Sequence, residues 1–229
     1  MSSNIHLYTT NTPNGVKISV TLEELGLPYE VTKIDFAKNT QKEPWFLEIN
    51  PNGRIPALTD TFADGEQIRV FESGSIMEYL VSRYDKDYKI SFAPGTREHI
   101  EMTSWLFFLN AGVGPIQIET KRLYGVLDKH LGENNREYLI GNKCTIADIA
   151  HIGWIASSGW AGIDIDQFPD LKAWKDRMWA RPVVQKGMNV PERDAPRRGI
   201  LKGEVEESIA AEARAWILKG MKEDAGNFK

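Results

Sequence analysis

A turn near the start of the chain, residues 9–17, has the residue types and the position to hold an anion. It follows a strand pattern at 5–8 and precedes an amphipathic helix pattern at 18–25, so it ends at a helix N-terminus. Unpaired backbone N–H groups and the positive end of the helix dipole favour an anion there, and a thiolate is an anion. The side-chain amide of Asn14 is placed to donate to it. Taken alone, Pro-Asn-Gly is also ordinary turn chemistry, with Asn as a helix cap.

Two further dipeptides, Ile55-Pro56 and Glu72-Ser73, suit the rest of a thiol-containing ligand. A cis bond before Pro56 would present the N–H and C=O of Ile55 to an extended peptide. Ser73 and the N–H groups of a helix start suit a carboxylate, whereas Glu72 suits an ammonium group. Each dipeptide also has an ordinary role, as a strand start or a helix cap. Together with the turn, they fit a ligand with an amino acid at one end, a peptide in the middle and a thiol at the other, which describes glutathione.

The elements that must position these residues alternate between strands and helices over the first 84 residues. The patterns predict strands at 5–8, 29–36, 54–60 and 67–71, and helices at 18–25, 44–47 and 76–84. A helix joins the first two strands, so they should be parallel, and Asp64-Gly65 makes a hairpin of the last two. We expect a small mixed sheet covered by helices.

Strand patterns stop at a linker, residues 85–95, and the rest of the chain reads as helical. Helices are predicted from 96, over 118–131, from 145, over 174–180 and over 204–222, and the apolar face of the first is assigned to Ile100, Trp105, Leu106 and Leu109. Thr145 and Asp148 form a capping-box pattern, so the role expected for Asp148 is structural and not catalytic.

Composition excludes several classes of function. The chain has 229 residues and a formal net charge of -4, so no basic surface for nucleic acid is indicated. No secretory signal or membrane-spanning stretch is visible, and a cytoplasmic location without membrane attachment is expected. The only cysteine, Cys144, cannot form an internal disulfide and is expected to be structural. The four histidines are scattered without ligand spacing, so no metal is expected.

Several motifs together resemble the glutathione transferases, in the branch of the bacterial nu class and of fungal transferases related to the yeast nitrogen-regulator prion protein. The matching segments are Thr-Pro-Asn-Gly at 12–15, Asn-Pro-Asn-Gly-Arg-Ile-Pro-Ala-Leu at 50–58, Glu-Ser-Gly-Ser-Ile at 72–76, and the stretches 119–124, 145–150 and 168–169 in the helical part. The resemblance implies an α/β thioredoxin-like N-terminal domain at 1–88, followed by an all-α C-terminal domain at 96–229.

The resemblance also implies roles for individual residues. Asn14 would orient or polarise the glutathione sulfur, with Thr12 beside it. The remaining glutathione contacts would come from Gln41 at the glycine end, from Arg54, Ile55 and Pro56 along the cysteinyl-glycine backbone, and from Glu72 and Ser73 at the γ-glutamyl end. A homodimer is implied, to which Trp45, Phe46 and Phe71 could contribute unless they belong to the core.

Two functions remain open at this point. In the first, the glutathione thiolate attacks a small electrophile or a disulfide, which makes the protein a transferase or a disulfide reductase. In the alternative, it is a non-enzymatic glutathione-binding regulatory or interaction domain. The connection at 114–119 is shorter than the family pattern by roughly a short helix pair, a stretch that normally walls the pocket of the second substrate. The second substrate is therefore not assigned.

Overall fold

The computed structural model describes residues 4–113, 120–133, 136–161 and 163–191. Its first part has the predicted order of strands and helices. The elements are β1 (His6–Thr9), α1 (Gly15–Leu25), β2 (Glu30–Lys33), the short 3₁₀ turns η1 (Phe36–Lys38) and η2 (Thr40–Lys42), α2 (Pro44–Ile49), β3 (Ala57–Thr61), β4 (Gln67–Phe71) and α3 (Ser73–Tyr84). The predicted alternation is therefore confirmed, with bounds that shift by a few residues.

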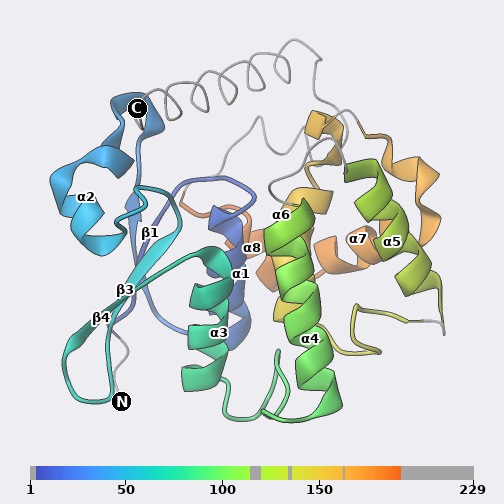
Figure 1. Cartoon of the computed structure of the whole chain (residues 1–229), viewed down its shortest axis with the longest axis horizontal. Coiled ribbons are helices and arrows are strands. Elements are labelled where there is room, and N and C mark those ends of the chain that lie inside the picture. Colours follow the sequence, from blue (N-terminus) through green and yellow to red (C-terminus); the bar gives the residue numbers. More distant parts are fainter. Residues whose placement is uncertain (1–3, 114–119, 134–135, 162, 192–229) are drawn as a thin grey trace.

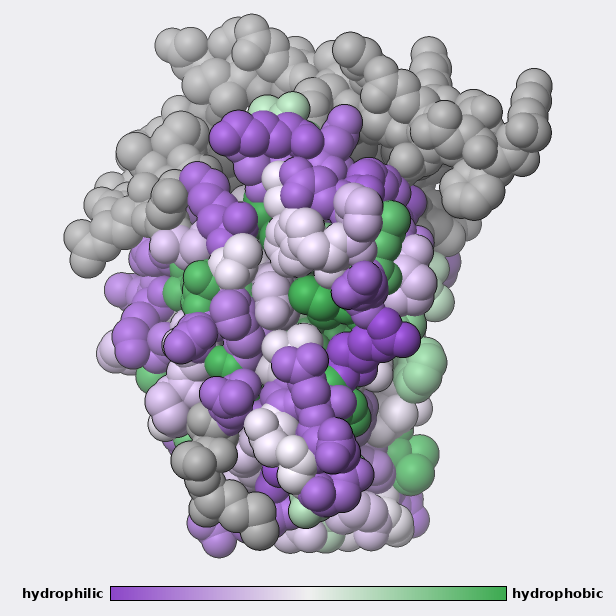
Figure 2. All heavy atoms as spheres, turned by 90° about the vertical axis from the view of Figure 1, so that its left-hand side faces the viewer, coloured by the Kyte–Doolittle hydropathy of each residue, from purple (hydrophilic) through white to green (hydrophobic). Residues whose placement is uncertain are grey.

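The four strands form one mixed sheet in the order β2-β1-β3-β4. β1 pairs in parallel with β2, and β3 pairs antiparallel with β4, as predicted. β1 also pairs antiparallel with β3, a pairing that the sequence did not indicate. In Figure 1, α1 and α3 lie between the sheet and the helices of the second part. A small separate core of Ile34, Phe46 and Ala57 packs where α2 meets the sheet. On the side of the molecule that faces left in Figure 1, hydrophobic residues form small areas among hydrophilic ones (Figure 2).

The second part contains helices and short helical turns. They are α4 (Arg97–Phe108), a π-helical turn η3 (Leu109–Val113), α5 (Thr120–Gly132), α6 (Ile146–Ile155), η6 (Ser158–Ala161), η7 (Ile165–Gln167), α7 (Pro169–Trp179) and α8 (Pro182–Gly187). The fold is thus a thioredoxin-like domain followed by an all-α domain. Among the described residues, no helix is long and apolar enough to cross a membrane.

One core joins the two parts through α1, which is buried on nearly every side. α8 contacts it so closely that a Cβ on Gly187 would lie 2.5 Å from the Cα of Val20. α6 is anchored by the predicted capping box between Thr145 and Asp148. α1 is therefore the helix of the first part against which the helical part packs.

Four expectations for the helical part need comment. The helix to which residues 174–180 are assigned is α7, and it begins at Pro169, because proline is favoured at the first helical position. Ile100 does not belong to the buried face of its helix, since 61% of its surface is exposed. The predicted start of the second helix at 118 and the predicted helix at 204–222 lie outside the described residues.

Candidate functional site

The pairing of the strands brings the three predicted pieces to one edge of the sheet. Tyr8 pairs with Ala57, and Ala57 pairs with Phe71, so these residues form one row across β1, β3 and β4. The turn at 9–17 follows this row on β1, Ile55-Pro56 precedes it on β3, and Glu72-Ser73 follows it on β4. Because neighbouring strands lie about 4.8 Å apart, the three pieces line one short edge.

At the first piece, Thr12 and not Asn14 caps the helix. The Oγ1 of Thr12 accepts from the backbone N–H of Gly15 at 3.0 Å, and its carbonyl accepts from Val16 at 3.1 Å. Asn14, the residue before α1, makes no side-chain capping hydrogen bond. An Asn at this position normally spends its side-chain oxygen on the helix N–H groups. Here the amide of Asn14 is left free for another partner.

Gly15 is required by the tightness of this turn. A Cβ at this position would lie 2.2 Å from the carbonyl oxygen of Thr10 and 2.4 Å from the Oγ1 of Thr9. Both distances are far shorter than van der Waals contact, so the turn admits no side chain here. The absence of a side chain at Gly15 thus lets the start of α1 pack against Thr9 and Thr10.

Helix α6 of the all-α part contacts the turn directly. The indole N–H of Trp154 donates to the Oδ1 of Asn14 at 3.2 Å, across 140 positions of sequence. The preceding Gly153 packs against the turn, since a Cβ there would lie 2.7 Å from the carbonyl oxygen of Pro13. Sequence reasoning missed Trp154, because no local pattern connects it with Asn14.

At the second piece, the loop before β3 is held by its own asparagine. The buried Asn50 donates through its Nδ2 to the carbonyl of Arg54 at 2.6 Å, and its Oδ1 accepts from the N–H of Asn52 at 3.0 Å. The Ile55–Pro56 peptide bond is cis. Among the described residues, the N–H and C=O of Ile55 have no hydrogen-bond partner.

Gln41 reaches the same loop through its main chain. A Cβ on Gly53, which has φ of +60°, would lie 2.9 Å from the carbonyl oxygen of Gln41. The Nε2 of Gln41 donates to Asn39 at 3.3 Å, whereas its Oε1 is buried without a partner among the described residues. The main chain of Gln41 therefore lies against Gly53, in the loop that also carries the exposed Arg54.

At the third piece, Glu72 has a left-handed backbone conformation, with φ of +66°. A residue other than glycine rarely adopts this conformation, and such strain concentrates at functional sites. The Oε1 of Glu72 accepts from the Nδ2 of Asn52 at 3.3 Å, which connects this turn with the loop before β3. Ser73, the first residue of α3, is buried.

A lysine of α1 supports Ser73 from inside the protein. The Nζ of Lys17 donates to the Oγ of Ser73 at 3.1 Å, and Lys17 is only 2% exposed. Burial lowers the pKa of Lys17 to about 7, although the charge of Glu72 acts in the opposite direction. Because the Ser73 oxygen accepts from Lys17, its own hydrogen is free to point away from Lys17. Sequence reasoning missed this lysine too.

His151 of α6 lies close enough to influence the same lysine. Its Nδ1 is 2.8 Å from the carbonyl of Ala147, and its Nε2 is buried without a partner among the described residues. Burial lowers the pKa of His151 to about 4, and the charge of Lys17 acts in the same direction. His151 is therefore neutral at physiological pH and adds no second positive charge beside Lys17.

The residues expected to be structural lie away from this edge. Cys144 is buried against Met178, and burial raises the pKa of its thiol, so it has little thiolate character. The carboxylate of Asp148 accepts from Leu139, Thr145 and Trp174. Among the described residues, no group of three or more His, Cys, Asp and Glu side chains is placed to hold a metal ion.

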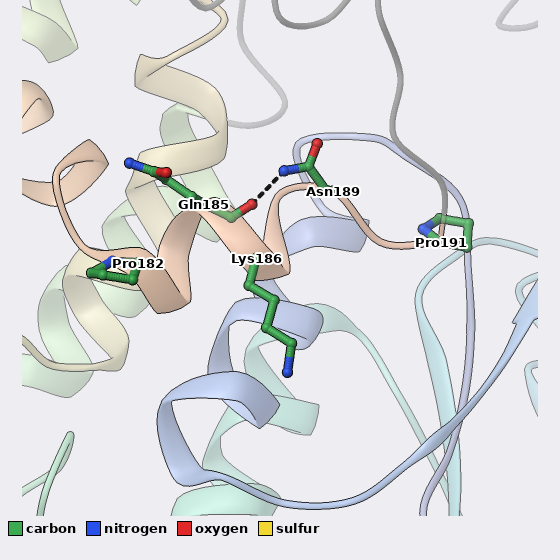
Figure 3. Close-up of a pocket in the computed structure, with 5 residues that line it drawn as sticks. All are labelled: Pro182, Gln185, Lys186, Asn189 and Pro191. Atoms are coloured by element: carbon green, nitrogen blue, oxygen red, sulfur yellow. Dashed lines mark hydrogen bonds between the residues drawn. The ribbon is translucent and has the colours of Figure 1, made fainter.

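A surface pocket of about 450 Å³ lies beside α8, apart from the predicted site residues (Figure 3). Its lining residues are Pro182, Gln185, Lys186, Asn189 and Pro191. Asn189 donates to the carbonyl of Gln185 at 2.6 Å, and Lys186 pairs with Glu23 at 2.6 Å. Its polar groups are thus engaged with the protein itself, and it adds no chemistry to the edge of the sheet.

Comparison with known proteins gives the family. The model of the glutathione S-transferase N-terminal domain matches residues 3–82, and that of the glutathione S-transferase C-terminal domain matches residues 117–182. The glutathione S-transferase-like protein tpcF of Aspergillus fumigatus is 37% identical over 217 residues, which cover 80% of this chain and 94% of that protein. The alignment has 217 positions but covers only 80% of the 229 residues of this chain, so some of its positions are filled in the relative and have no counterpart here.

A bacterial relative and a solved structure agree with this assignment. The disulfide-bond oxidoreductase YfcG of Escherichia coli is 36% identical, over 80% of this chain and 94% of that protein. The crystal structure of a glutathione transferase homolog from Lodderomyces elongisporus, with two GSH per subunit, has a TM-score of 0.79 and 40% identity over 82% of this chain and 99% of that one. The resemblance inferred from the motifs is confirmed, and the chain belongs to the glutathione S-transferase family.

Proposed function

We propose that the protein is a glutathione-dependent enzyme, a transferase or a disulfide-bond reductase, that activates the glutathione thiol at the turn around Asn14. The observation that carries the proposal is the row Tyr8–Ala57–Phe71, which aligns the turn, the Ile55-Pro56 segment and the Glu72-Ser73 segment along one edge. Glutathione offers one chemical group to each segment: the thiol of its central cysteine to the turn, its peptide backbone to Ile55-Pro56, and its γ-glutamyl amino acid to Glu72-Ser73.

In this proposal each end of glutathione has its own partners. The γ-glutamyl carboxylate accepts from Ser73, whose oxygen is held by Lys17, and the ammonium group pairs with Glu72. The free N–H and C=O of Ile55, next to the cis bond at Pro56, pair with the cysteinyl backbone as an added strand would. Arg54 is assigned to the cysteinyl-glycine backbone beside Ile55, and Gln41 to the glycine end, which the closeness of Gln41 to Gly53 supports.

The sulfur then lies at the turn, with Asn14 as its donor and Thr12 beside it. The free thiol has a pKa of about 8.5, so only a few per cent is thiolate at neutral pH. The N-terminus of α1 and the amide N–H groups of Asn14 favour the thiolate. A neutral amide cannot accept a proton, so the part of Asn14 is electrostatic and its loss should slow the reaction without abolishing it.

Disulfide reduction is the reaction to test first. The glutathione thiolate attacks one sulfur of the disulfide, a mixed disulfide forms, and the other sulfur leaves as a thiolate. A second glutathione then resolves the mixed disulfide and yields glutathione disulfide. The oxidoreductase named among the relatives supports this choice, and so does the neighbouring structure with two GSH per subunit.

The test is turnover of purified protein with glutathione against hydroxyethyl disulfide and against chlorodinitrobenzene. Asn14→Ala is compared with the wild type, and Asn189→Ala beside α8 serves as the matched control. We expect disulfide turnover that falls roughly 10- to 100-fold in Asn14→Ala, the effect of one hydrogen bond to a charged group, and that is unchanged in the control.

The other outcomes separate the alternatives. Conjugation without disulfide turnover would make the protein a conjugating transferase. Glutathione binding without turnover of either acceptor would favour the regulatory alternative. No binding of glutathione at all would refute the proposed site.

We also propose a homodimer in a reducing, cytoplasmic setting, with the domains divided between residues 88 and 96. Ile100 and Phe107, two turns apart on α4, are 61% and 66% exposed in the single chain. Exposed apolar side chains of this kind are typical of a surface that a second subunit covers. Trp45 is 39% exposed and available, whereas Phe46 belongs to the core and is removed from the earlier candidates. Light scattering of the wild type and of Phe107→Asp tests the assembly.

A further inference from the structure

The hydrogen bond between Trp154 and Asn14 settles which way the Asn14 amide faces. An indole N–H can only donate, so the atom that receives it must be the Oδ1 of Asn14. In a planar amide, fixing the oxygen also fixes the nitrogen on the other side. Among the described residues, the Nδ2 of Asn14 has no hydrogen-bond partner. Two donors are thus held at the turn with their direction already set.

Without this hydrogen bond, the amide would have other uses for its oxygen. An Asn at a helix start tends to turn its oxygen to the N–H groups of the first turn. After that rotation the Oδ1 of Asn14 would accept from the helix N–H groups, and its Nδ2 would have no defined direction. Thr12 already occupies the capping role through its bond from Gly15, and Trp154 holds the oxygen of Asn14. The two residues together keep the amide nitrogen available.

The position of Trp154 is itself well determined. Its carbonyl accepts from the hydroxyl of the buried Tyr124 at 3.2 Å. The next residue toward the N-terminus, Gly153, packs on Pro13, and α6 begins at the capping box of Thr145 and Asp148. The indole therefore approaches the turn from a helix that is anchored at its start and in contact with the turn.

We propose that Trp154 is a positioning residue that orients the Asn14 amide so that its nitrogen, and not its oxygen, faces the glutathione thiolate. This inference rests on the proposed function, because it assumes that the sulfur lies at this turn. An amide that faced the thiolate with its oxygen would repel it. The all-α domain thereby contributes to activation of the thiol, through a residue that need not touch the ligand.

The test is Trp154→Phe, which keeps an aromatic ring and removes the N–H donor. Loss of one neutral hydrogen bond predicts a fall in kcat/KM of roughly 2- to 13-fold at neutral pH. The acid limb of the pH-rate profile should move to higher pH, because less of the bound thiol is ionised. Affinity for S-methylglutathione, which has no thiol, should stay unchanged. Trp179→Phe on α7 is the matched control and should change none of these.

A double-mutant comparison separates positioning from packing. In an Asn14→Ala background, Trp154→Phe should have no further effect on rate or on the pH profile, since the amide it orients is gone. An equal loss in both backgrounds, or an unmoved pH profile, would overturn the inference. A wild type without any glutathione turnover would instead overturn the proposed function, so the two failures are distinguishable.

Discussion

Replacing Lys17 by methionine should change the pH dependence of stability in a defined direction. Lys17 is 2% exposed, and burial lowers its pKa to about 7. In the unfolded chain a lysine has a pKa of about 10.4. Between these values the unfolded state binds more protons than the folded state, so the contribution of Lys17 to stability rises with pH.

The size of the effect follows from one-proton linkage. From pH 7 to pH 9, stability should rise by about 2 kcal/mol through Lys17 alone, whereas below pH 7 its contribution is nearly constant. In Lys17→Met this term is absent. The variant also loses the hydrogen bond to Ser73, which costs about 1 kcal/mol but does not depend on pH. The test is therefore how the difference in unfolding free energy between the two proteins changes from pH 7 to pH 9, and not the sign of that difference at one pH.

The assay is urea unfolding followed by tryptophan fluorescence at pH 7 and pH 9, at one protein concentration, since association would shift the midpoints. Other groups that titrate in this range, such as the buried thiol of Cys144, are common to both proteins and cancel. Lys38→Met is the matched control, because that side chain is 79% exposed. From pH 7 to pH 9, the unfolding free energy of the wild type should rise by about 2 kcal/mol more than that of Lys17→Met. Parallel pH curves for the two proteins would refute the reasoning.

Four further predictions concern the site. Asn14→Asp keeps an oxygen for the Trp154 N–H but replaces the amide nitrogen by a second oxygen, so kcat/KM should fall further than in Asn14→Ala, as steady-state kinetics can show; a rate equal to the wild type would contradict this. Gly15→Ala should destabilise the protein by several kcal/mol or disorder the turn, because its Cβ would lie 2.2 Å from Thr10 O, and thermal unfolding measures it. Gly153→Ala should lower activity and glutathione affinity although it adds only a methyl group, since that group would press on Pro13, whereas Gly159→Ala, with open space, should be silent in the same assays. Binding of S-methylglutathione at pH 8 should take up a proton in the wild type and not in Lys17→Met, because a carboxylate at Ser73 favours the charged lysine. Calorimetry in two buffers of different ionisation enthalpy measures this uptake. If the wild type gave the same binding heat in both buffers, the placement of the γ-glutamyl end would be contradicted.

The local part of the fold could be predicted from the sequence because its signals are local. Alternation of apolar residues gives β2, a Gly at the hairpin gives β3 and β4, and the capping box gives the start of α6. The pairing of β1 with β3, and with it the row Tyr8–Ala57–Phe71, was not part of the prediction, because no turn joins these two strands and fixes their register. The three motifs could still be assigned to one ligand from the sequence, because the assignment used the chemistry, order and spacing of their residues and not the pairing of the strands.

The contacts that the all-α domain makes could not be predicted in this way. α1 reads as amphipathic, but its polar residues are buried too: Lys17 donates to Ser73 of α3, and Ser19 donates to the carbonyl of Gly187 on α8. The bond from Trp154 to Asn14 depends on how two domains dock, which no periodicity encodes. Ile100 shows the converse, since helical spacing assigned it to the core while the described fold leaves it exposed.

The pKa of the glutathione thiol bound to the protein tests the central claim most directly. It can be read from the ultraviolet absorbance of the thiolate as pH is varied, for the wild type and for Asn14→Ala. The account predicts a pKa below the free value of about 8.5 in the wild type, and a rise of about one to two units in Asn14→Ala. A bound thiol that titrates like free glutathione in the wild type, or that is indifferent to Asn14→Ala, would contradict the claim that this turn stabilises the thiolate.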